Sequence, residues 1–366
     1  MSDFNSLSAD TQAVLLLCAQ FGVKNQDNLK SLTLKEYNLL TQLLQQQQLR
    51  PGDLLNRDLI HGLNSHLNAN LDPERIQALL NRGALLALKV EEWTNQGLWI
   101  LSRGDDDYPQ RLKLKLRYQA PPLLYGIGNL ELLKSGGLAI VGSRNIEQEE
   151  VDYTAHVGQL CSKYGITIVS GGAKGVDQAA MLSAIEAEGT SIGVVANDLA
   201  KFATTKHYRD AIRENQLVLI SPYDPQARFQ VGNAMGRNKL IYALADQALV
   251  VCAAYQSGGT WAGAVEELKR EQACPLWVRV SEATPLGNQG LLDLGAKPLL
   301  AEDISQCLFA SAQDSQPIAH IPIEKVETTS LPSLSNINDR NYPLEDQGQD
   351  QVAEKVTVQL SLNFSN

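Results

Sequence analysis

Three glycine-rich segments in this chain each follow a short apolar run. They are 142–144 (GSR), 170–177 (SGGAKGVD) and 256–260 (QSGGT). Glycine lets backbone N–H groups come close to an anion, hydroxyl groups add donors, and Arg144 and Lys174 add positive charge. None of the segments has the spacing of a Walker A loop or of the dinucleotide motif G-x-G-x-x-G. The chemistry that they share is that of phosphate binding.

A fourth polar segment, 237–239 (RNK), stands directly before the apolar residues 240–244 (LIYAL). This position places it at the start of a helix that enters the core. Tight turns without a ligand explain any one of the glycine-rich segments, but they explain all three less readily. We therefore predict one phosphate-binding site, made by the glycine-rich segments and the polar segment together. The predicted site residues are Gly142, Ser143, Arg144, Ser170, Gly171, Gly172, Lys174, Arg237, Asn238, Lys239, Ser257, Gly258, Gly259 and Thr260.

Six short runs in the middle of the chain are continuously apolar and rich in β-branched residues, which is typical of strands buried on both faces. Helical patterns lie between them, for example at Val151–Tyr164 and Lys174–Gly189. This alternation predicts an α/β fold with a doubly wound, mainly parallel sheet. Ligands bind where the carboxyl ends of such strands meet, so the candidate residues should come together there. The predicted strands are Leu138–Val141, Ile166–Val169, Ser191–Val195, Leu217–Ile220, Ala248–Cys252 and Pro275–Val280.

Residues 1–95 are helical in pattern and form a separate predicted domain. Apolar residues on one helical face predict helices at Thr11–Phe21, with Ser8 or Asp10 as the cap, and at Leu34–Gln48. Another helix should open at Asp72-Pro73, with the aspartate as N-cap and the proline in the first turn. The sheet-forming domain is predicted to span residues 96–312.

The net charge of −10 is distributed unevenly along the 366 residues. Residues 1–137 are neutral, residues 138–300 carry −3 and residues 301–366 carry −7. The acidic, proline-interrupted segment 313–366 therefore predicts a flexible tail, and the rest of the chain has room for a basic patch. Within the tail, 355–364 (KVTVQLSLNF) alternates like a β-strand, so disorder and docking on a sheet edge both stay open.

Composition excludes several other classes of protein. An apolar content of 44% and a charged content of 20% are ordinary for a globular protein. No stretch approaches the roughly 20 apolar residues that span a bilayer, and the N-terminus does not have the pattern of a signal peptide. The five cysteines are widely spaced without a C-x-x-C pair, and no histidine has metal-ligand spacing. We therefore expect a cytoplasmic protein with reduced thiols, and neither a metal site nor membrane association.

Basic and aromatic residues stand beside the predicted strands. The basic residues by themselves are typical of a solvated surface. Three aromatic residues among them, Tyr208, Tyr223 and Phe229, either stack on nucleobases or pack in the core. The basic residues are Lys201, Lys206, His207, Arg209, Arg213 and Arg228.

A series of motifs in this chain resembles the DNA-processing protein A family (DprA, also called Smf). The series begins with 99–109 (WILSRGDDDYP) and continues through 121–125 (PPLLY) to the GSR and SGGAKGVD segments. The resemblance covers about residues 95–300. It implies an extended Rossmann-like domain that binds single-stranded DNA without catalysis or cofactor, as a homodimer. It also implies that the protein helps to load the recombinase RecA during DNA uptake or recombination.

By motif matching, the resemblance implies that Arg144 and Lys174 contact phosphates and that Arg237 lines the same groove. Two departures remove cations that family members usually carry. The Arg-Asn pair lies in the context GNAMGRN instead of Pro-Arg-Arg-Asn, and Gln256 replaces a lysine. We expect these losses to weaken DNA binding and to flatten its salt dependence. Many family members also end in a winged helix, where this chain has the acidic tail.

A second family offers an alternative function. Gly258-Gly259-Thr260, followed by Glu266 or Glu267, is similar to the motif of the lonely-guy nucleotide glycohydrolases. That resemblance implies a nucleoside monophosphate as the substrate and makes Arg237 and Glu266 the candidate catalytic pair. A sensor that binds a nucleotide-derived ligand without hydrolysing it, and a protein scaffold without either ligand, are the remaining hypotheses.

Overall fold

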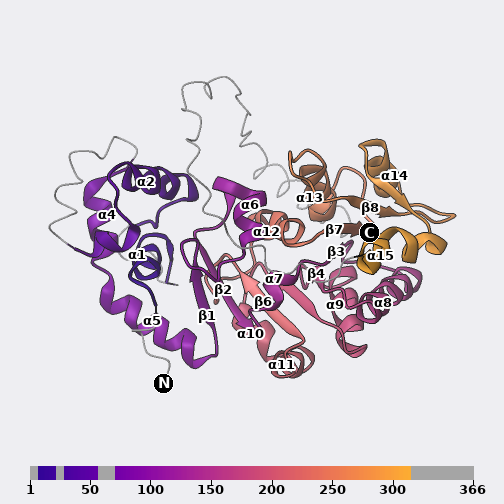
Figure 1. The fold of residues 1–366 in the computed structure, drawn as a ribbon, viewed down its shortest axis with the longest axis horizontal. Helices are drawn as coiled ribbons and strands as arrows, with labels where there is room; N and C mark the ends of the chain where they lie inside the picture. The colour runs from indigo at the N-terminus through magenta and orange to yellow at the C-terminus, as the bar shows by residue number, and fades with distance from the viewer. Residues whose placement is uncertain (1–6, 22–28, 57–70, 315–366) are drawn as a thin grey trace, which may run out of the picture. The chain divides into compact units, whose positions relative to one another are not determined.

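The structure is a computed structural model that describes residues 7–21, 29–56 and 71–314. Figure 1 shows the path of the chain, with helical elements first and the sheet following them. The residues of the predicted tail from Ser315 onward, including the strand-like segment 355–364, lie outside the described residues. The helical elements before the sheet are α1 (Ala9–Cys18), α2 (Leu34–Gln46), η2 (Pro51–Leu55), α4 (Pro73–Leu80) and α5 (Gly83–Asn95).

Helix α1 is the centre of this helical part. Its residues 13–17 (AVLLL) are all buried, so the expectation of a single apolar face was wrong. The helix is covered all round because it packs on helices α4 and α5 and also on the sheet. Ser8 is its N-cap and accepts a hydrogen bond from the Thr11 amide, while Asp10 accepts hydrogen bonds from Arg50 and the Gly52 amide instead. At α4, Asp72 is the N-cap that the sequence predicts.

A nine-stranded sheet forms the core of the rest of the described chain, with the strand order β1-β2-β6-β5-β4-β3-β7-β8-β9. The six predicted strands are confirmed as β3 to β8, and their mutual pairings are parallel. The prediction missed three strands, which are short or contain glycine: the edge strands β1 and β9, and β2, which pairs with β1 and β6. Strands β1 and β2 pair antiparallel. The strands are β1 (Trp99–Ser102), β2 (Leu123–Gly128), β3 (Leu138–Val141), β4 (Ile168–Ser170), β5 (Ser191–Val194), β6 (Leu217–Ser221), β7 (Gln247–Val250), β8 (Leu276–Arg279) and β9 (Lys297–Leu299).

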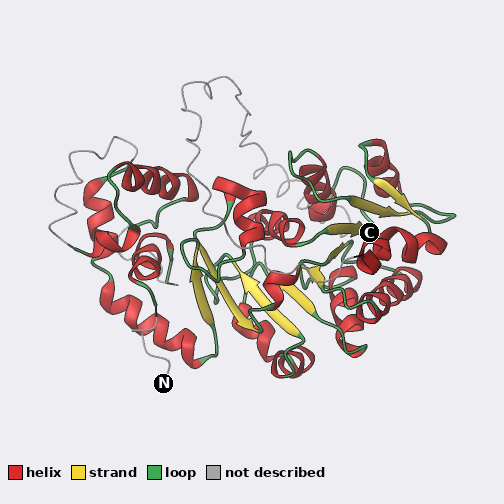
Figure 2. Cartoon of the chain, viewed as in Figure 1, coloured by secondary structure: helices red, strands yellow, loops and turns green. Residues whose placement is uncertain are grey.

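Helices cover both faces of this sheet (Figure 2). Strand β3 shows the division, because Leu138 and Ile140 join one buried cluster, with α8 and α9, while Ala139 and Val141 join another, with α12 and α6. This two-sided burial explains why the strand is continuously apolar. The helical elements from the sheet onward are α6 (Gln110–Leu116), η4 (Arg117–Gln119), α7 (Leu132–Ser135), α8 (Gln148–Lys163), α9 (Val176–Glu186), α10 (Leu199–Thr204), α11 (Lys206–Arg213), α12 (Val231–Leu244), α13 (Gly258–Leu268), α14 (Leu286–Asp293), η5 (Ala301–Asp303) and α15 (Ile304–Asp314). No helix in the described ranges is long and apolar enough to cross a membrane.

The sheet changes its winding direction between β3 and β7. The chain proceeds outward from β3 to β4 and β5 on one side, and from β7 to β8 and β9 on the other. The loops after β3 and β7 therefore diverge, and they leave a crevice outside the carboxyl ends of these two strands. Such a switch point is the usual ligand site of open α/β sheets.

Asn288 of helix α14 fixes the strand-end loop after β7. Its side chain is fully buried, and its amide oxygen accepts a hydrogen bond from the Ala253 N–H at 2.9 Å. Its amide nitrogen donates to the carbonyl oxygens of Val251 and Arg279 at 2.9 and 3.0 Å. One side chain thus satisfies three backbone groups from two neighbouring strand ends.

Replacing Asn288 with alanine should destabilise the fold, because three buried backbone groups lose their partner. We expect Asn288→Ala to lower the free energy of unfolding in urea by about 2–4 kcal/mol. The neighbouring exposed Gln289 donates only to Asp293 on the helix surface, so Gln289→Ala should change the same quantity by less than about 0.5 kcal/mol. Equal stabilities of the two variants would show that the buried amide does not hold the loop.

Candidate phosphate and nucleic-acid site

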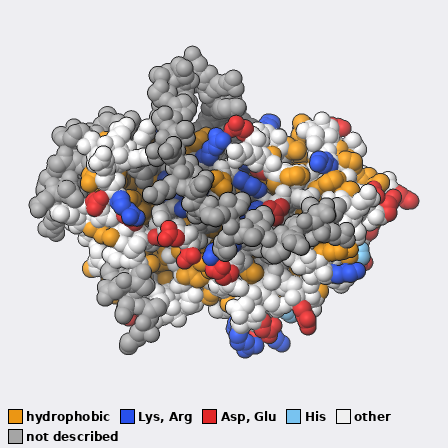
Figure 3. All heavy atoms as spheres, viewed as in Figure 1, with side chains coloured by type: hydrophobic (Ala, Val, Ile, Leu, Met, Phe, Trp, Pro, Cys, Tyr) orange, Lys and Arg blue, Asp and Glu red, His pale blue; other side chains and the backbone are white. Residues whose placement is uncertain are grey.

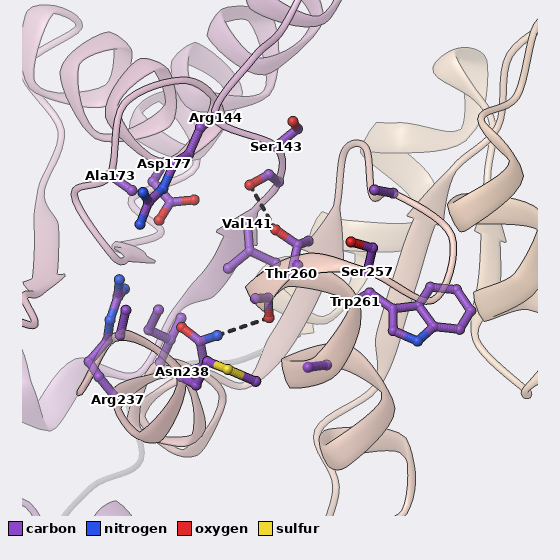
Figure 4. Close-up of a pocket in the computed structure, with 18 of the residues that line it drawn as sticks. Val141, Ser143, Arg144, Ala173, Asp177, Arg237, Asn238, Ser257, Thr260 and Trp261 are labelled. Atoms are coloured by element: carbon purple, nitrogen blue, oxygen red, sulfur yellow. Dashed lines mark hydrogen bonds between the residues drawn. The ribbon is translucent and has the colours of Figure 1, made fainter. Parts of the chain in front are cut away.

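A cavity of about 700 Å³ lies at the switch point (Figure 4). It is lined by the loops after β3 and β7, by the loop after β4, and by helices α12 and α13. A second cavity of about 200 Å³ shares Arg144 and Arg237 with it and is lined further by residues 171–174 after β4. The predicted site residues that line one or both cavities are Gly142, Ser143, Arg144, Gly171, Gly172, Lys174, Arg237, Asn238, Ser257, Gly258, Gly259 and Thr260.

Arg237 supplies a buried positive charge to both cavities. Helix α12 carries it, and only 5% of the residue is exposed. Its Nε and Nη1 atoms are buried, and no residue in the described ranges forms a hydrogen bond with them. Burial lowers the pKa of the guanidinium, and the nearby Asp177 carboxylate partly offsets this effect. An arginine stays protonated in proteins, so the cavity holds a charged fork donor that an anion can bind.

Asp177 lies beside Arg237 and is itself held in place. Burial raises the pKa of its carboxyl group, while Arg237 and hydrogen bonds from the backbone amides of Gly142, Ala173 and Gly171 lower it. The carboxylate therefore ties the strand-end loops after β3 and β4 to the first turn of helix α9. Its negative charge also compensates part of the cost of burying the Arg237 guanidinium.

Gly171 makes room for this pair of charges. A β-carbon at this position would lie 1.6 Å from Nη1 of Arg237 and 2.5 Å from Oδ2 of Asp177. The guanidinium and the carboxylate thus lie over the same α-carbon. Every residue other than glycine would have to displace the guanidinium, so Gly171 is required here for the close approach.

Arg144 and Phe229 lie together where the two cavities meet. The Arg144 guanidinium carbon is 5.2 Å from the centre of the Phe229 ring, and both residues line both cavities. Phe229 is 48% exposed, so the ring and the cation are both accessible. Of the three aromatic residues considered for stacking, Phe229 is the one at the cavities, because Tyr208 is buried against Phe202 and Tyr223 lines neither cavity.

Two side chains hold the opposite wall together (Figure 4). The Thr260 hydroxyl donates to the Gly142 carbonyl at 2.8 Å, and the Asn238 amide donates to the Gly259 carbonyl at 3.0 Å. These bonds join the start of helix α13 to strand β3 and to helix α12. Ser257, the N-cap of α13, makes no side-chain hydrogen bond to the helix, so its side chain leaves the first amides of α13 uncapped where residues 257–260 line the cavity.

The structure places three candidate residues outside the cavities. Ser170 is fully buried, and its hydroxyl donates to the Ile140 carbonyl at 2.6 Å, which is a structural role. Lys239 lines neither cavity, because it lies two residues after Arg237 and so faces another side of helix α12. Glu266 is exposed and pairs with Arg270 at 3.5 Å, so it is not brought to Arg237 as the glycohydrolase alternative requires.

Residues that the sequence reasoning did not assign also belong to the site. Asp177 stands in the SGGAKGVD segment, but no pattern in the sequence shows that it lies beside Arg237. Trp261 lines the larger cavity from the first turn of α13. The basic residues of α10 and α11 and Arg228 line neither cavity, which fits a solvated surface. On the face in Figure 3, Lys and Arg side chains lie among acidic and hydrophobic ones outside the grey atoms.

Comparison with known proteins places the chain in a family. Residues 99–309 match the family described as DNA recombination-mediator protein A. The DNA processing protein DprA of Streptococcus pneumoniae is 35% identical over 175 residues, which is 47% of this chain and 61% of that protein. Protein Smf of Synechocystis is 31% identical over 222 residues, 58% of this chain and 54% of that protein. The chain thus spans about half to three fifths of the length of these two relatives.

Solved structures agree with this assignment at the level of the fold. The crystal structure of DprA from Streptococcus pneumoniae aligns with a TM-score of 0.60 and 22% identity, covering 82% of this chain and 98% of that one. DprA from Helicobacter pylori, whose structure describes a single-stranded DNA binding mode, aligns with a TM-score of 0.50 and 24% identity, covering 60% of this chain and 97% of that one. Because the family match takes in more than half of its residues, the chain belongs to the DNA recombination-mediator protein A family, the DprA/Smf proteins.

Proposed function

We propose that this chain binds single-stranded DNA through its phosphates at the switch-point cavities, without catalysing a reaction on it. The observation that carries the proposal is the buried Arg237 guanidinium, whose Nε and Nη1 have no hydrogen-bond partner among the described residues. A buried donor without a partner is costly, and a phosphate oxygen supplies both the missing acceptor and the opposite charge.

The surroundings of Arg237 favour a nucleic-acid strand as the ligand over a small molecule that the cavity would enclose. Arg144 and Lys174 are exposed at the rim of the smaller cavity, where they can contact further phosphates along a backbone. Phe229 offers an accessible ring beside them. A groove with cations along the backbone and aromatic rings for the bases is the usual design of single-strand binders. The relative from Helicobacter pylori, which binds single-stranded DNA, supports the same proposal.

We further propose that the protein acts as a homodimer in the cytoplasm and delivers the bound strand to a RecA-type recombinase. The name of the family, a recombination mediator, supports this role. The five cysteines, all described and all unpaired, fit a reducing compartment.

Arg144→Ala should weaken binding of short oligonucleotides of any sequence to a similar extent, because phosphate contacts carry no base information. One lost contact should reduce the slope of log K against log salt by about 0.7. Fluorescence anisotropy at several salt concentrations measures both quantities. Arg117→Ala is the matched control, since that exposed arginine lines neither cavity. If the two variants bind DNA equally well, Arg144 is not a phosphate contact.

Gly171→Ala should weaken DNA binding although it removes no charge. The added methyl group displaces the Arg237 guanidinium, and loss of one charge-assisted contact is expected to cost roughly tenfold in affinity. The same titration measures it, and circular dichroism confirms that the fold is kept. Gly83→Ala is the control, because a β-carbon there meets nothing within 4 Å. Unchanged affinity in folded Gly171→Ala would separate Arg237 from DNA binding.

The recombinase proposal predicts that the protein shortens the lag of RecA assembly on a strand that is coated with single-strand binding protein. The Arg144→Ala variant should shorten the lag less than the wild-type chain does at equal concentration, because it binds the strand less tightly. Strand-dependent ATP hydrolysis by RecA reports the lag, and light scattering of the free protein reports the dimer. If this protein binds the strand and the lag of RecA assembly is nevertheless unchanged, the proposal of recombinase loading is rejected and the proposal of DNA binding stands.

A further inference from the structure

Tyr255 and Trp261 form an aromatic pair at one end of the larger cavity. Their ring centres are 5.2 Å apart, and their planes meet at 65° in an edge-to-face arrangement. Tyr255 is 53% exposed and Trp261 is half-buried. Trp261 lines the cavity together with the loop residues on either side of Tyr255, Ala254 and Gln256. Tyr255 does not itself line the cavity, but it is exposed to solvent directly beside it, in contact with the lining residue Trp261.

Helix α14 packs against both rings of the pair. A β-carbon at Gly290 would lie 2.6 Å from the Tyr255 ring and 2.8 Å from the Trp261 ring, so both rings rest directly on the backbone of this helix. Asn288 of the same helix holds the preceding loop through its hydrogen bond to the Ala253 amide. The Tyr255 hydroxyl accepts a hydrogen bond from the Gln256 side chain at 3.1 Å. These contacts restrict both rings before any ligand arrives.

The aromatic pair and the buried cation occupy different ends of the same cavity. In Figure 4, Trp261 lies on the opposite side of the view from Arg237, with Thr260 and Asn238 between them. The charged residues that line this cavity are Arg144, Asp177 and Arg237, and none of them belongs to the loop or helix that carries the aromatic pair. A volume of about 700 Å³ is within the range of pockets that hold small organic ligands.

We propose that Tyr255 and Trp261 form a stacking site for a nucleobase of the strand whose phosphate binds at Arg237. This inference rests on the proposed function and adds a base contact to its phosphate contacts. A nucleotide joins a charged phosphate to a flat, weakly polar base. The cavity offers a buried guanidinium at one end and the half-buried Trp261 ring at the other, with the exposed Tyr255 ring beside it. Every nucleobase has a face that stacks, so the site accepts all four bases. It gives the protein an affinity component that salt does not screen.

The test compares two oligonucleotides of equal length and equal phosphate number, one of thymidine nucleotides and one with abasic residues throughout. The wild-type chain should bind the thymidine strand about 5- to 150-fold more tightly than the abasic strand, as stacking of one base implies. Tyr255→Ala and Trp261→Ala should each lower the affinity for the thymidine strand more than the affinity for the abasic strand, and so reduce this preference. Tyr118→Ala is the control, because that tyrosine is also exposed, at 69%, and neither it nor its two chain neighbours line a cavity, whereas the neighbours of Tyr255 line the larger one.

Tryptophan fluorescence provides a second readout that does not depend on affinity. Base stacking should quench the emission of the wild-type chain at saturating thymidine strand, and Trp261→Phe should abolish the quench while the three other tryptophans remain. Saturable binding of both strands with equal affinity by the wild-type chain would overturn the stacking site and leave phosphate binding standing. Absence of binding to either strand at low salt would overturn both the stacking site and the proposed function.

Discussion

The guanidinium of Arg237 is a charge held almost out of contact with water, and the strand-end loops are arranged around it. Burying an ion costs several kcal/mol unless nearby groups compensate it. Asp177 compensates part of this cost, since its carboxylate is held beside the arginine by three backbone amides. Two nitrogen atoms of the guanidinium nevertheless have no hydrogen-bond partner in the part of the chain that the structure describes. The protein thus keeps a strong donor group available in a fixed position, which reduces the reorganisation that binding an anion requires.

The position of this charge follows from the topology of the sheet. Reversal of the winding between β3 and β7 opens the crevice, and helix α12 crosses it with Arg237 on its buried side. The short strand-end loops then determine what the crevice offers. Gly171 lets the guanidinium approach the backbone, and Thr260 joins helix α13 to strand β3. Arg144, Lys174 and Phe229 lie exposed at the rim, which suits the proposed binding of a long ligand whose anionic group reaches the buried part.

Most of the sheet could be predicted from sequence because strands buried on both faces are continuously apolar, as in LAIV at β3. Strands β1, β2 and β9 were missed because their signals are weaker; β9, for example, has three residues with a proline in the middle. At the site, the glycine-rich loops were found because strand ends in a parallel sheet converge. The local pattern does not show which polar residues face the cavity. Ser170 and Lys239 lie within three residues of true lining residues but point elsewhere, and Asp177 acquires its role only through contacts across the fold.

The most direct measurement is a crystal structure of the full chain with a short oligothymidylate. Binding through the buried guanidinium predicts a phosphate oxygen within hydrogen-bond distance of Nε or Nη1 of Arg237, with Asp177 still held by its three backbone amides. A bound strand that leaves both nitrogen atoms without a partner, or one that lies on another face of the sheet, would contradict the central role of Arg237.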